Sequence, residues 1–239
     1  MSDNRASDPA LLAAMRADRD LARLSAAFME KTIEHRYSYN FTWLGIPIIQ
    51  YPQDVVALQE IIWEYKPELI IETGVAHGGS TVFFASMLEM IGTGGVLGID
   101  VDIRAHNRMV IQAHPLARRI ELLDGSSTDP AVVAVARERA AGKRVVVVLD
   151  SNHTADHVAG ELEAYSPLVK SGGYLVVFDT IIETLPGTFP DRPWSHGNNP
   201  MTAVHSFLRH DDRFEIAEDI LATLLVTAAP DGYLRCVKD

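Results

Sequence analysis

Five short runs rich in Ile, Leu and Val alternate with helix-length segments from residue 69 onward, and this alternation restricts the fold more than any other feature. Each run is about five to seven residues long, which is typical of parallel strands that helices bury on both faces. Such strand–helix alternation predicts an α/β fold with a doubly wound, mostly parallel sheet. The runs are LIIETG (69–74), GVLGIDV (95–101), RIELLDG (119–125), RVVVVLD (144–150) and YLVVFD (174–179).

The segments between these runs have the length and the start signals of helices. Asp129 before Pro130, and Asn199 before Pro200, each place an N-cap residue ahead of a proline at the first helical position. The expected helices are 79–91, 104–113, 129–141, 154–170 and 201–210. Two short runs near the end of the chain are expected to close the sheet as an antiparallel pair: Phe214–Ile216 and Ala222–Ala229.

The N-terminal part of the chain has a different pattern. From Pro9 to about Tyr37 apolar residues recur at helical spacing with charged residues between them, which predicts one or two amphipathic helices. A further helix is expected over Pro52–Tyr65. We therefore divide the chain into an N-terminal helical accessory segment, residues 1–65, and a main α/β domain, residues 66–239.

Composition excludes several classes of protein and partner. With 21 Lys and Arg against 32 Asp and Glu, the chain of 239 residues has a formal net charge of −11, which disfavours binding to nucleic acid. Cys236 is the only cysteine, so no intrachain disulfide is possible. The first residues lack the apolar core of a signal peptide, and the aliphatic run Val145–Leu149 is too short to span a bilayer. We expect a cytoplasmic protein without a membrane or nucleic-acid partner.

An acidic residue stands at or near the end of each predicted strand. Ligands of open α/β sheets bind outside the carboxyl ends of the strands, so these acids are expected to line one rim. Any one of them alone is more simply explained as the cap of the next helix. Together they form a rim that repels a diphosphate and attracts a cation. The acids are Glu72, Asp100, Asp124, Asp150 and Asp179.

The turn after the first of these strands has the pattern E-x-G-x-x-x-G-G-S, from Glu72 to Ser80. Gly74 and Gly79 allow the backbone to approach a ligand closely, and the helix that follows supplies free N–H groups. The spacing is neither that of a dinucleotide-binding turn nor that of a P-loop. Glu72 suits a ligand with an ammonium group, and Asp100 is placed to accept from both ribose hydroxyls. S-adenosylmethionine combines these two features.

Residues 51–239 resemble the family of cephalosporin hydroxylases, which includes rhamnosyl O-methyltransferases and the cephamycin methoxylation protein. The resemblance implies a Rossmann-like class I methyltransferase fold for residues 66–239. It also implies S-adenosylmethionine as the methyl donor, a divalent metal such as Mg²⁺, and homo-oligomers. The stretches that carry it are ETGVAHGGS, GIDVDIR, LLDGSSTD, VVLDSNHTADHVAGELEAYSPLV, GGYLVVFDT and RPWSHGNNP.

Carried over to this chain, the resemblance places the donor site on the glycine turn and on the ends of the next strands. Ser126 and Ser127 follow the third strand, where the rim for the adenine base is expected. The donor-site residues so implied are Glu72, Gly74, Gly79, Ser80, Asp100, Ser126, Ser127 and Asp150.

Asp150 and Asp179 end two successive strands and are the predicted metal ligands, because hard oxygen donors suit Mg²⁺. Members of the resembled family often have an acidic pair at the end of the fifth strand, and here Phe178 replaces the first acid of that pair. The third protein ligand is therefore expected to be Thr180 or Glu183, with Thr180 matching the position used by catechol-type methyltransferases.

His153, three residues after Asp150, is the predicted general base. The acceptor hydroxyl must lose its proton as the methyl group arrives, and a neutral imidazole near the metal can accept it. We thus expect His153 and Asp150 to be the catalytic residues. A competing hypothesis uses Asp150, His153 and His157 as an iron site with two histidines and one carboxylate, for a hydroxylase. It leaves Asp179 without a role.

The segment 180–200 is long, rich in proline and lacks periodicity, which is typical of a functional loop. Phe189 and Trp194 favour an ordered flap, and Trp194 with its polar neighbours suits a sugar. The expected function is therefore an S-adenosylmethionine- and metal-dependent O-methyltransferase for a sugar hydroxyl of a glycosylated natural product or polysaccharide. The alternatives are methylation or hydroxylation of an antibiotic scaffold such as a β-lactam, and a non-catalytic S-adenosylmethionine-binding subunit of a partner enzyme.

Overall fold

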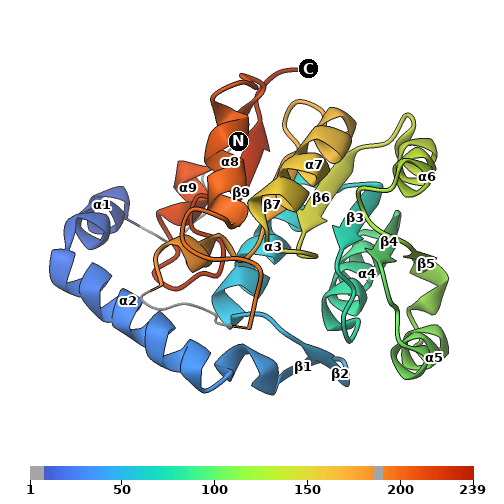
Figure 1. Cartoon of the computed structure of the whole chain (residues 1–239), viewed down its shortest axis with the longest axis horizontal. Coiled ribbons are helices and arrows are strands. Elements are labelled where there is room, and N and C mark those ends of the chain that lie inside the picture. Colours follow the sequence, from blue (N-terminus) through green and yellow to red (C-terminus); the bar gives the residue numbers. More distant parts are fainter. Residues whose placement is uncertain (1–7, 186–190) are drawn as a thin grey trace.

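The structure is a computed structural model that describes residues 8–185 and 191–239. Its main sheet contains seven strands, which are β3 (Leu69–Thr73), β4 (Gly95–Asp100), β5 (Ile120–Asp124), β6 (Val145–Leu149), β7 (Tyr174–Val177), β8 (Phe214–Ile216) and β9 (Tyr233–Cys236). They follow the spatial order β5-β4-β3-β6-β7-β9-β8 (Figure 1). Strands β3 to β7 pair in parallel, whereas β9 is antiparallel to both β7 and β8. The predicted mostly parallel sheet with an antiparallel C-terminal pair is confirmed.

Two layers of helices bury the two faces of this sheet. Successive side chains of a strand point to opposite faces, so Ile70 of β3 joins one apolar core while Leu69 and Ile71 join the other. The first core includes side chains of α3 (Pro52–Tyr65) and α4 (Gly79–Ile91), and the second those of α6 (Pro130–Ala140), α7 (Ala155–Tyr165) and α8 (Pro200–Leu208). A third, small core lies under α5 (Ala105–Ala113). The predicted helices are thus present, with shifts of a few residues at their ends.

The N-terminal segment forms two helices and a hairpin. Helices α1 (Pro9–Ala17) and α2 (Arg19–Glu34) lie at one end of the molecule, opposite α5 and α6 (Figure 1). The hairpin of β1 (Phe41–Trp43) and β2 (Ile46–Ile48) follows them. This hairpin lies against the start of α4 so closely that a Cβ atom on Gly79 would stand 2.2 Å from the Pro47 carbonyl oxygen. The division into residues 1–65 and 66–239 stays a prediction.

One part of the C-terminal prediction is wrong. The antiparallel partner of β8 is β9 rather than residues 222–229, which contain no strand. That segment is held to α3, because the buried carboxylate of Asp54 accepts hydrogen bonds from the Thr227 hydroxyl and the Ala228 amide. A run of small apolar residues does not reveal such a distant polar anchor. Within the described residues, no helix is long and apolar enough to cross a membrane.

The anchor at Asp54 is expected to make stability depend on pH. Burial raises the pKa of this carboxyl from 3.8 to about 6, although hydrogen bonds from Thr227, Ala228 and Tyr233 oppose the rise. The folded protein therefore holds this proton more tightly than the unfolded chain, and the resulting stability, present below pH 4, is lost as pH rises through 6. At about 1.4 kcal/mol per pKa unit, this loss amounts to about 3 kcal/mol.

Chemical denaturation of the wild type and of Asp54→Asn between pH 4 and pH 7 measures this effect. The asparagine cannot ionise. Between pH 4 and pH 7 the unfolding free energy of the variant should therefore decrease by about 3 kcal/mol less than that of the wild type. Other acids contribute equally to both proteins and cancel in the difference. Parallel pH profiles for the two proteins would show that Asp54 does not titrate in this range.

Candidate active site

A cavity of about 610 Å³ opens at the carboxyl ends of β3, β6 and β7. Its walls come from four parts of the chain: residues between Ile33 and Tyr51, the glycine turn from Gly74 to Ser80, residues that follow β6 and β7, and Ala228 before β9. The first of these walls belongs to the N-terminal segment. A cavity of this size falls in the range of small-molecule sites, and its place at the strand ends is the usual one in open α/β sheets.

The glycine turn forms the floor of the cavity, and Gly74, Gly79 and Ser80 are all part of its lining. Gly74 adopts φ +89°, and a Cβ atom there would stand 2.0 Å from the backbone oxygen of Asp150. Only glycine fits where β3 and β6 end side by side. The turn predicted for donor binding is therefore brought directly against the predicted metal ligand.

Glu72, the first predicted donor residue, lies beneath the turn instead of in the cavity lining. Its side chain is buried, and it accepts a hydrogen bond from the hydroxyl of Thr81. Burial raises the pKa of the Glu72 carboxyl from 4.5 to about 7, while hydrogen bonds from the side chains of Ser80 and Thr81 act in the opposite direction. Glu72 thus connects the end of β3 to the first turn of α4.

Three other predicted donor residues also lie outside the cavity lining. Asp100 accepts hydrogen bonds from the backbone amides of Val75 and Ala76, at 2.9 and 3.1 Å, and so holds the glycine turn in place. The hydroxyls of Ser126 and Ser127 contact neighbouring polar side chains. Binding of the donor by Asp100, Ser126 and Ser127 stays a prediction.

The acid at the end of β5 is neutralised by a basic residue. The guanidinium of Arg108, on α5, lies 2.5 Å from the carboxylate of Asp124. Sequence spacing does not indicate this pair, because it depends on how α5 packs beside the edge of the sheet. Asp124 is therefore not part of the acidic rim predicted from the five strand ends.

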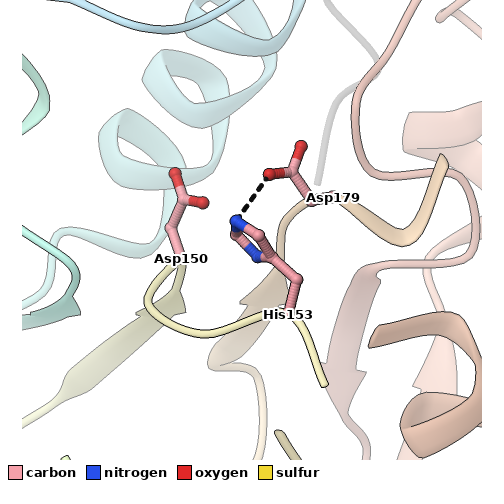
Figure 2. A group of neighbouring side chains, drawn as sticks. All are labelled: Asp150, His153 and Asp179. Atoms are coloured by element: carbon pink, nitrogen blue, oxygen red, sulfur yellow. Dashed lines mark ion pairs between the residues drawn. The ribbon is translucent and has the colours of Figure 1, made fainter. Parts of the chain in front are cut away.

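Asp150, His153 and Asp179 form a compact cluster in the cavity. One ligand atom from each lies within 4.8 Å of the others (Figure 2). The His153 Nε2 atom stands 3.1 Å from Oδ2 of Asp179, and the His153 side chain is 17% exposed. Because β6 and β7 are neighbouring parallel strands, their ends bring Asp150 and Asp179 together. Asp179 also has φ +56°, a left-handed conformation that is unusual outside glycine and is found at functional sites.

Electrostatics at this cluster favour a positively charged ligand. Burial raises the pKa of the Asp150 carboxyl well above its usual range, and the nearby carboxyl group of Asp179 raises it further. The amide Nε2 of Gln50 donates to Oδ2 of Asp150 at 3.1 Å and acts in the opposite direction. The two carboxylates suit a divalent cation, since they supply hard oxygen donors, and the imidazole of His153 lies within 4.8 Å of both.

The two residues predicted to supply a third metal ligand both make hydrogen bonds to groups outside the cluster. The hydroxyl of the buried Thr180 donates to the carbonyl of Pro230 at 2.5 Å. The Glu183 carboxylate accepts from the backbone amide of Gly197 and from the side chain of Asn199. Among the His, Cys, Asp and Glu side chains of the described residues, the cluster contains His153 and not Glu183. Metal binding by Thr180 stays a prediction.

Phe178 and His157 also lie away from the cluster centre. Phe178, which stands where the resembled family often has an acid, is buried and packs edge-on against the ring of Tyr233. His157 contacts the hydroxyls of Ser127 and Ser151, at 3.0 and 3.2 Å. The iron site of two histidines and one carboxylate therefore lacks its second histidine in this arrangement.

Trp194, in the 180–200 loop, reaches the cluster. It lines the cavity, and its ring meets the ring of His153 edge-on, with centroids 4.7 Å apart. The guanidinium of Arg192 lies 5.1 Å from the centre of the Trp194 ring. Phe189, the other aromatic residue of the predicted flap, lies outside the described residues.

Gln50 is a site residue that no sequence pattern predicted. It lies between β2 and α3, a hundred positions before Asp150 in the chain. The only sequence signal is an isolated amide in the apolar stretch Ile48–Tyr51. Such a residue is consistent with many roles, so its contact with Asp150 was not predictable.

Comparisons with known proteins agree with the fold. The family model Rhamnosyl O-methyltransferase/CmcI matches residues 35–237. A rhamnosyl O-methyltransferase of Mycobacterium bovis is 36% identical over 210 residues, covering 81% of this chain and 77% of the relative. A rhamnosyl O-methyltransferase of Mycobacterium leprae is 33% identical over 214 residues, covering 84% of this chain and 87% of the relative.

Solved structures share the fold. An apo structure of CmcI superposes with a TM-score of 0.60 at 22% identity, covering 84% of this chain and 78% of CmcI. A CmcI structure with Mg and SAM gives a TM-score of 0.59 at 20% identity, covering 83% and 77%. The family model and the curated relatives establish that the chain belongs to the rhamnosyl O-methyltransferase/CmcI family and is an S-adenosylmethionine-dependent O-methyltransferase.

Proposed function

We propose that the protein transfers the methyl group of S-adenosylmethionine to a hydroxyl of a sugar, with the help of a bound divalent cation such as Mg²⁺. The observation that carries this proposal is the cluster of Asp150, His153 and Asp179 in a cavity whose floor is the glycine turn. The relatives named rhamnosyl O-methyltransferase support a sugar as the acceptor.

The donor would lie along the glycine turn, next to the cluster. Gly74 and Gly79 let the turn pack against the backbone of Asp150 and Pro47. Among the described residues, no side chain caps the start of α4, so its first backbone N–H groups are available to a ligand. The carboxylates of Asp150 and Asp179, which line the cavity, suit the positive charges of the donor. Because donor and cluster share one cavity, the protein can hold the methyl carbon in line with an acceptor oxygen, which supplies much of the acceleration in such transfers.

Asp150 and Asp179 would hold the divalent cation, with His153 beside it. When bound, such a cation lowers the pKa of a coordinated hydroxyl and orients it. The Nε2 atom of His153 lies 3.1 Å from Oδ2 of Asp179 (Figure 2), so a neutral imidazole that donates to this carboxylate through Nε2 would take up the proton of the acceptor hydroxyl at Nδ1. Asp179 then stabilises the imidazolium that results, because its carboxylate is already within hydrogen-bond distance.

The acceptor would occupy the part of the cavity between the N-terminal segment and the 191–200 segment. Tyr39 and Trp194 contribute aromatic surface there, and Arg192 contributes hydrogen-bond donors. Aromatic rings pack against the C–H faces of sugars while polar groups bind the hydroxyls. Trp194 also contacts the ring of His153, so an acceptor bound against Trp194 would lie next to the proposed base.

A methyl-transfer assay with isotopically labelled S-adenosylmethionine and a panel of rhamnosides, other glycosides and a β-lactam tests the proposal. We expect label in a glycoside product, loss of transfer when a chelator removes the metal, and recovery when Mg²⁺ is added back. Donor binding without turnover on any glycoside would favour the non-catalytic binding subunit. Turnover of the β-lactam that requires iron and 2-oxoglutarate would instead favour a hydroxylase.

A further inference from the structure

Gln50 is a buried amide whose two polar atoms have unequal surroundings. Its side chain lines the cavity, and the residue is only 6% exposed. The Nε2 atom donates to Oδ2 of Asp150 at 3.1 Å. The Oε1 atom is buried and has no hydrogen-bond partner among the described residues. The Gln50 side chain therefore gains a hydrogen bond to Asp150 but leaves its own oxygen without a donor.

An apolar side chain of similar length would be expected at this position if packing alone mattered. Burying an amide oxygen without a donor lowers stability, and leucine or methionine would avoid that cost. Two neighbours of Gln50 in the chain, Ile48 and Tyr51, belong to the main core. The advantage of an amide at this position is its hydrogen bond to the carboxylate of Asp150.

Packing fixes the backbone around Gln50, so its side chain meets Asp150 in a defined orientation. Ile48 and Tyr51, on either side, are 3% and 4% exposed. The Tyr51 hydroxyl bonds to the hydroxyl of Thr32 on α2, at 2.9 Å. The preceding strand β2 lies against Gly79, which has no side chain to separate them. Gln50 thus reaches Asp150 from a support that is independent of β6 and its loop.

We propose that Gln50 is a positioning residue that fixes the orientation in which Asp150 binds the divalent cation. This inference rests on the proposed metal dependence. The carboxylate of an aspartate rotates easily about its last bond, so an unsupported Asp150 would sample many orientations. Hydrogen bonds from neighbouring groups commonly orient metal-binding side chains in this way. The N-terminal segment therefore completes the metal centre as well as forming a wall of the cavity.

Binding of Mn²⁺, used in place of Mg²⁺ and followed by electron paramagnetic resonance, tests the proposal on the full-length protein. Gln50→Leu should raise the Kd for Mn²⁺ by about 10- to 100-fold, the range found when such orienting partners are lost. Gln53→Leu is the matched control, because Gln53 lies three residues later with its side chain exposed on α3. Its Kd should equal that of the wild type.

The Mg²⁺ dependence of methyl transfer separates positioning from a general structural defect. In Gln50→Leu, the Mg²⁺ concentration for half-maximal activity should rise by the same factor as the Kd, while saturating Mg²⁺ restores kcat to near the wild-type value. A damaged fold would lower kcat at every Mg²⁺ concentration. Should Gln50→Leu not fold, Gln50→Met offers a flexible apolar side chain of equal length and the same expected loss.

The outcomes distinguish this inference from the proposed function. Equal Mn²⁺ affinity in the wild type and Gln50→Leu would overturn the role of Gln50 and leave the metal dependence intact. A wild type that binds no Mn²⁺ would overturn both. Weaker Mn²⁺ binding in Gln50→Leu alone, with an unchanged circular dichroism spectrum, supports the inference.

Discussion

Replacing Asp150 with asparagine should lower kcat/KM for methyl transfer by about 10³-fold, because the polarisation supplied by a bound metal is worth several kcal/mol. The substitution preserves the shape of the side chain and its contact with Gln50 but removes one of the two carboxylates of the cluster. Steady-state kinetics at saturating donor and Mg²⁺ measure the loss, and Mn²⁺ binding should weaken in parallel.

Asp124→Asn is the matched control for this variant. Asp124 also ends a strand of the sheet, yet its carboxylate pairs with Arg108 away from the cavity. Its kinetics should be those of the wild type. Asp150→Asn should also leave the metal-free protein at least as stable as the wild type, because it removes a carboxyl whose ionised form burial disfavours. An Asp150→Asn enzyme with a tenth or more of wild-type activity would contradict a metal-binding role for Asp150.

His153→Ala should lower kcat by about 10²- to 10⁴-fold, which is the usual contribution of a positioned general base. The imidazole is removed, while Asp150 and Asp179 remain to bind the cation. We therefore expect donor affinity and Mn²⁺ affinity to change little. Pre-steady-state methyl transfer, together with Mn²⁺ binding, measures both effects on one variant.

His205→Ala is the control for this second prediction. The Nε2 atom of His205 also contacts an aspartate, Asp231, at 2.9 Å, but His205 does not line the cavity. Its activity should match the wild type. If His153→Ala loses Mn²⁺ binding together with activity, His153 is a metal ligand, and another group must take the proton from the acceptor.

Much of the scaffold of the site was predictable because it depends on local pattern. Each strand is short and aliphatic with an acid at or near its end, so neighbouring strand ends were expected to meet at the carboxyl edge of a parallel sheet, as Asp150 and Asp179 do. The glycines of the turn were equally informative, since close backbone approach requires residues without side chains. Asp150 and Asp179 were therefore predicted together as a pair before any tertiary contact was known.

The composition of the cluster depended on contacts between distant segments. His153, predicted as a base, lies with the two carboxylates, whereas Thr180 bonds to the Pro230 carbonyl. Gln50 reaches Asp150 across a hundred residues of chain. Such contacts depend on how the hairpin, the helices and the loops pack on the sheet. Local patterns in the sequence do not predict this packing.

Local patterns predict the sheet, the glycine turn and the edge that carries Asp150 and Asp179, because periodicity and strand-end residues act over a few positions. Packing between distant segments pairs Asp124 with Arg108, binds residues 222–229 to Asp54 in place of a strand, and puts Gln50 beside Asp150. The physical reason is one and the same: burial forces each polar group to find a partner, and that partner can lie anywhere in the chain.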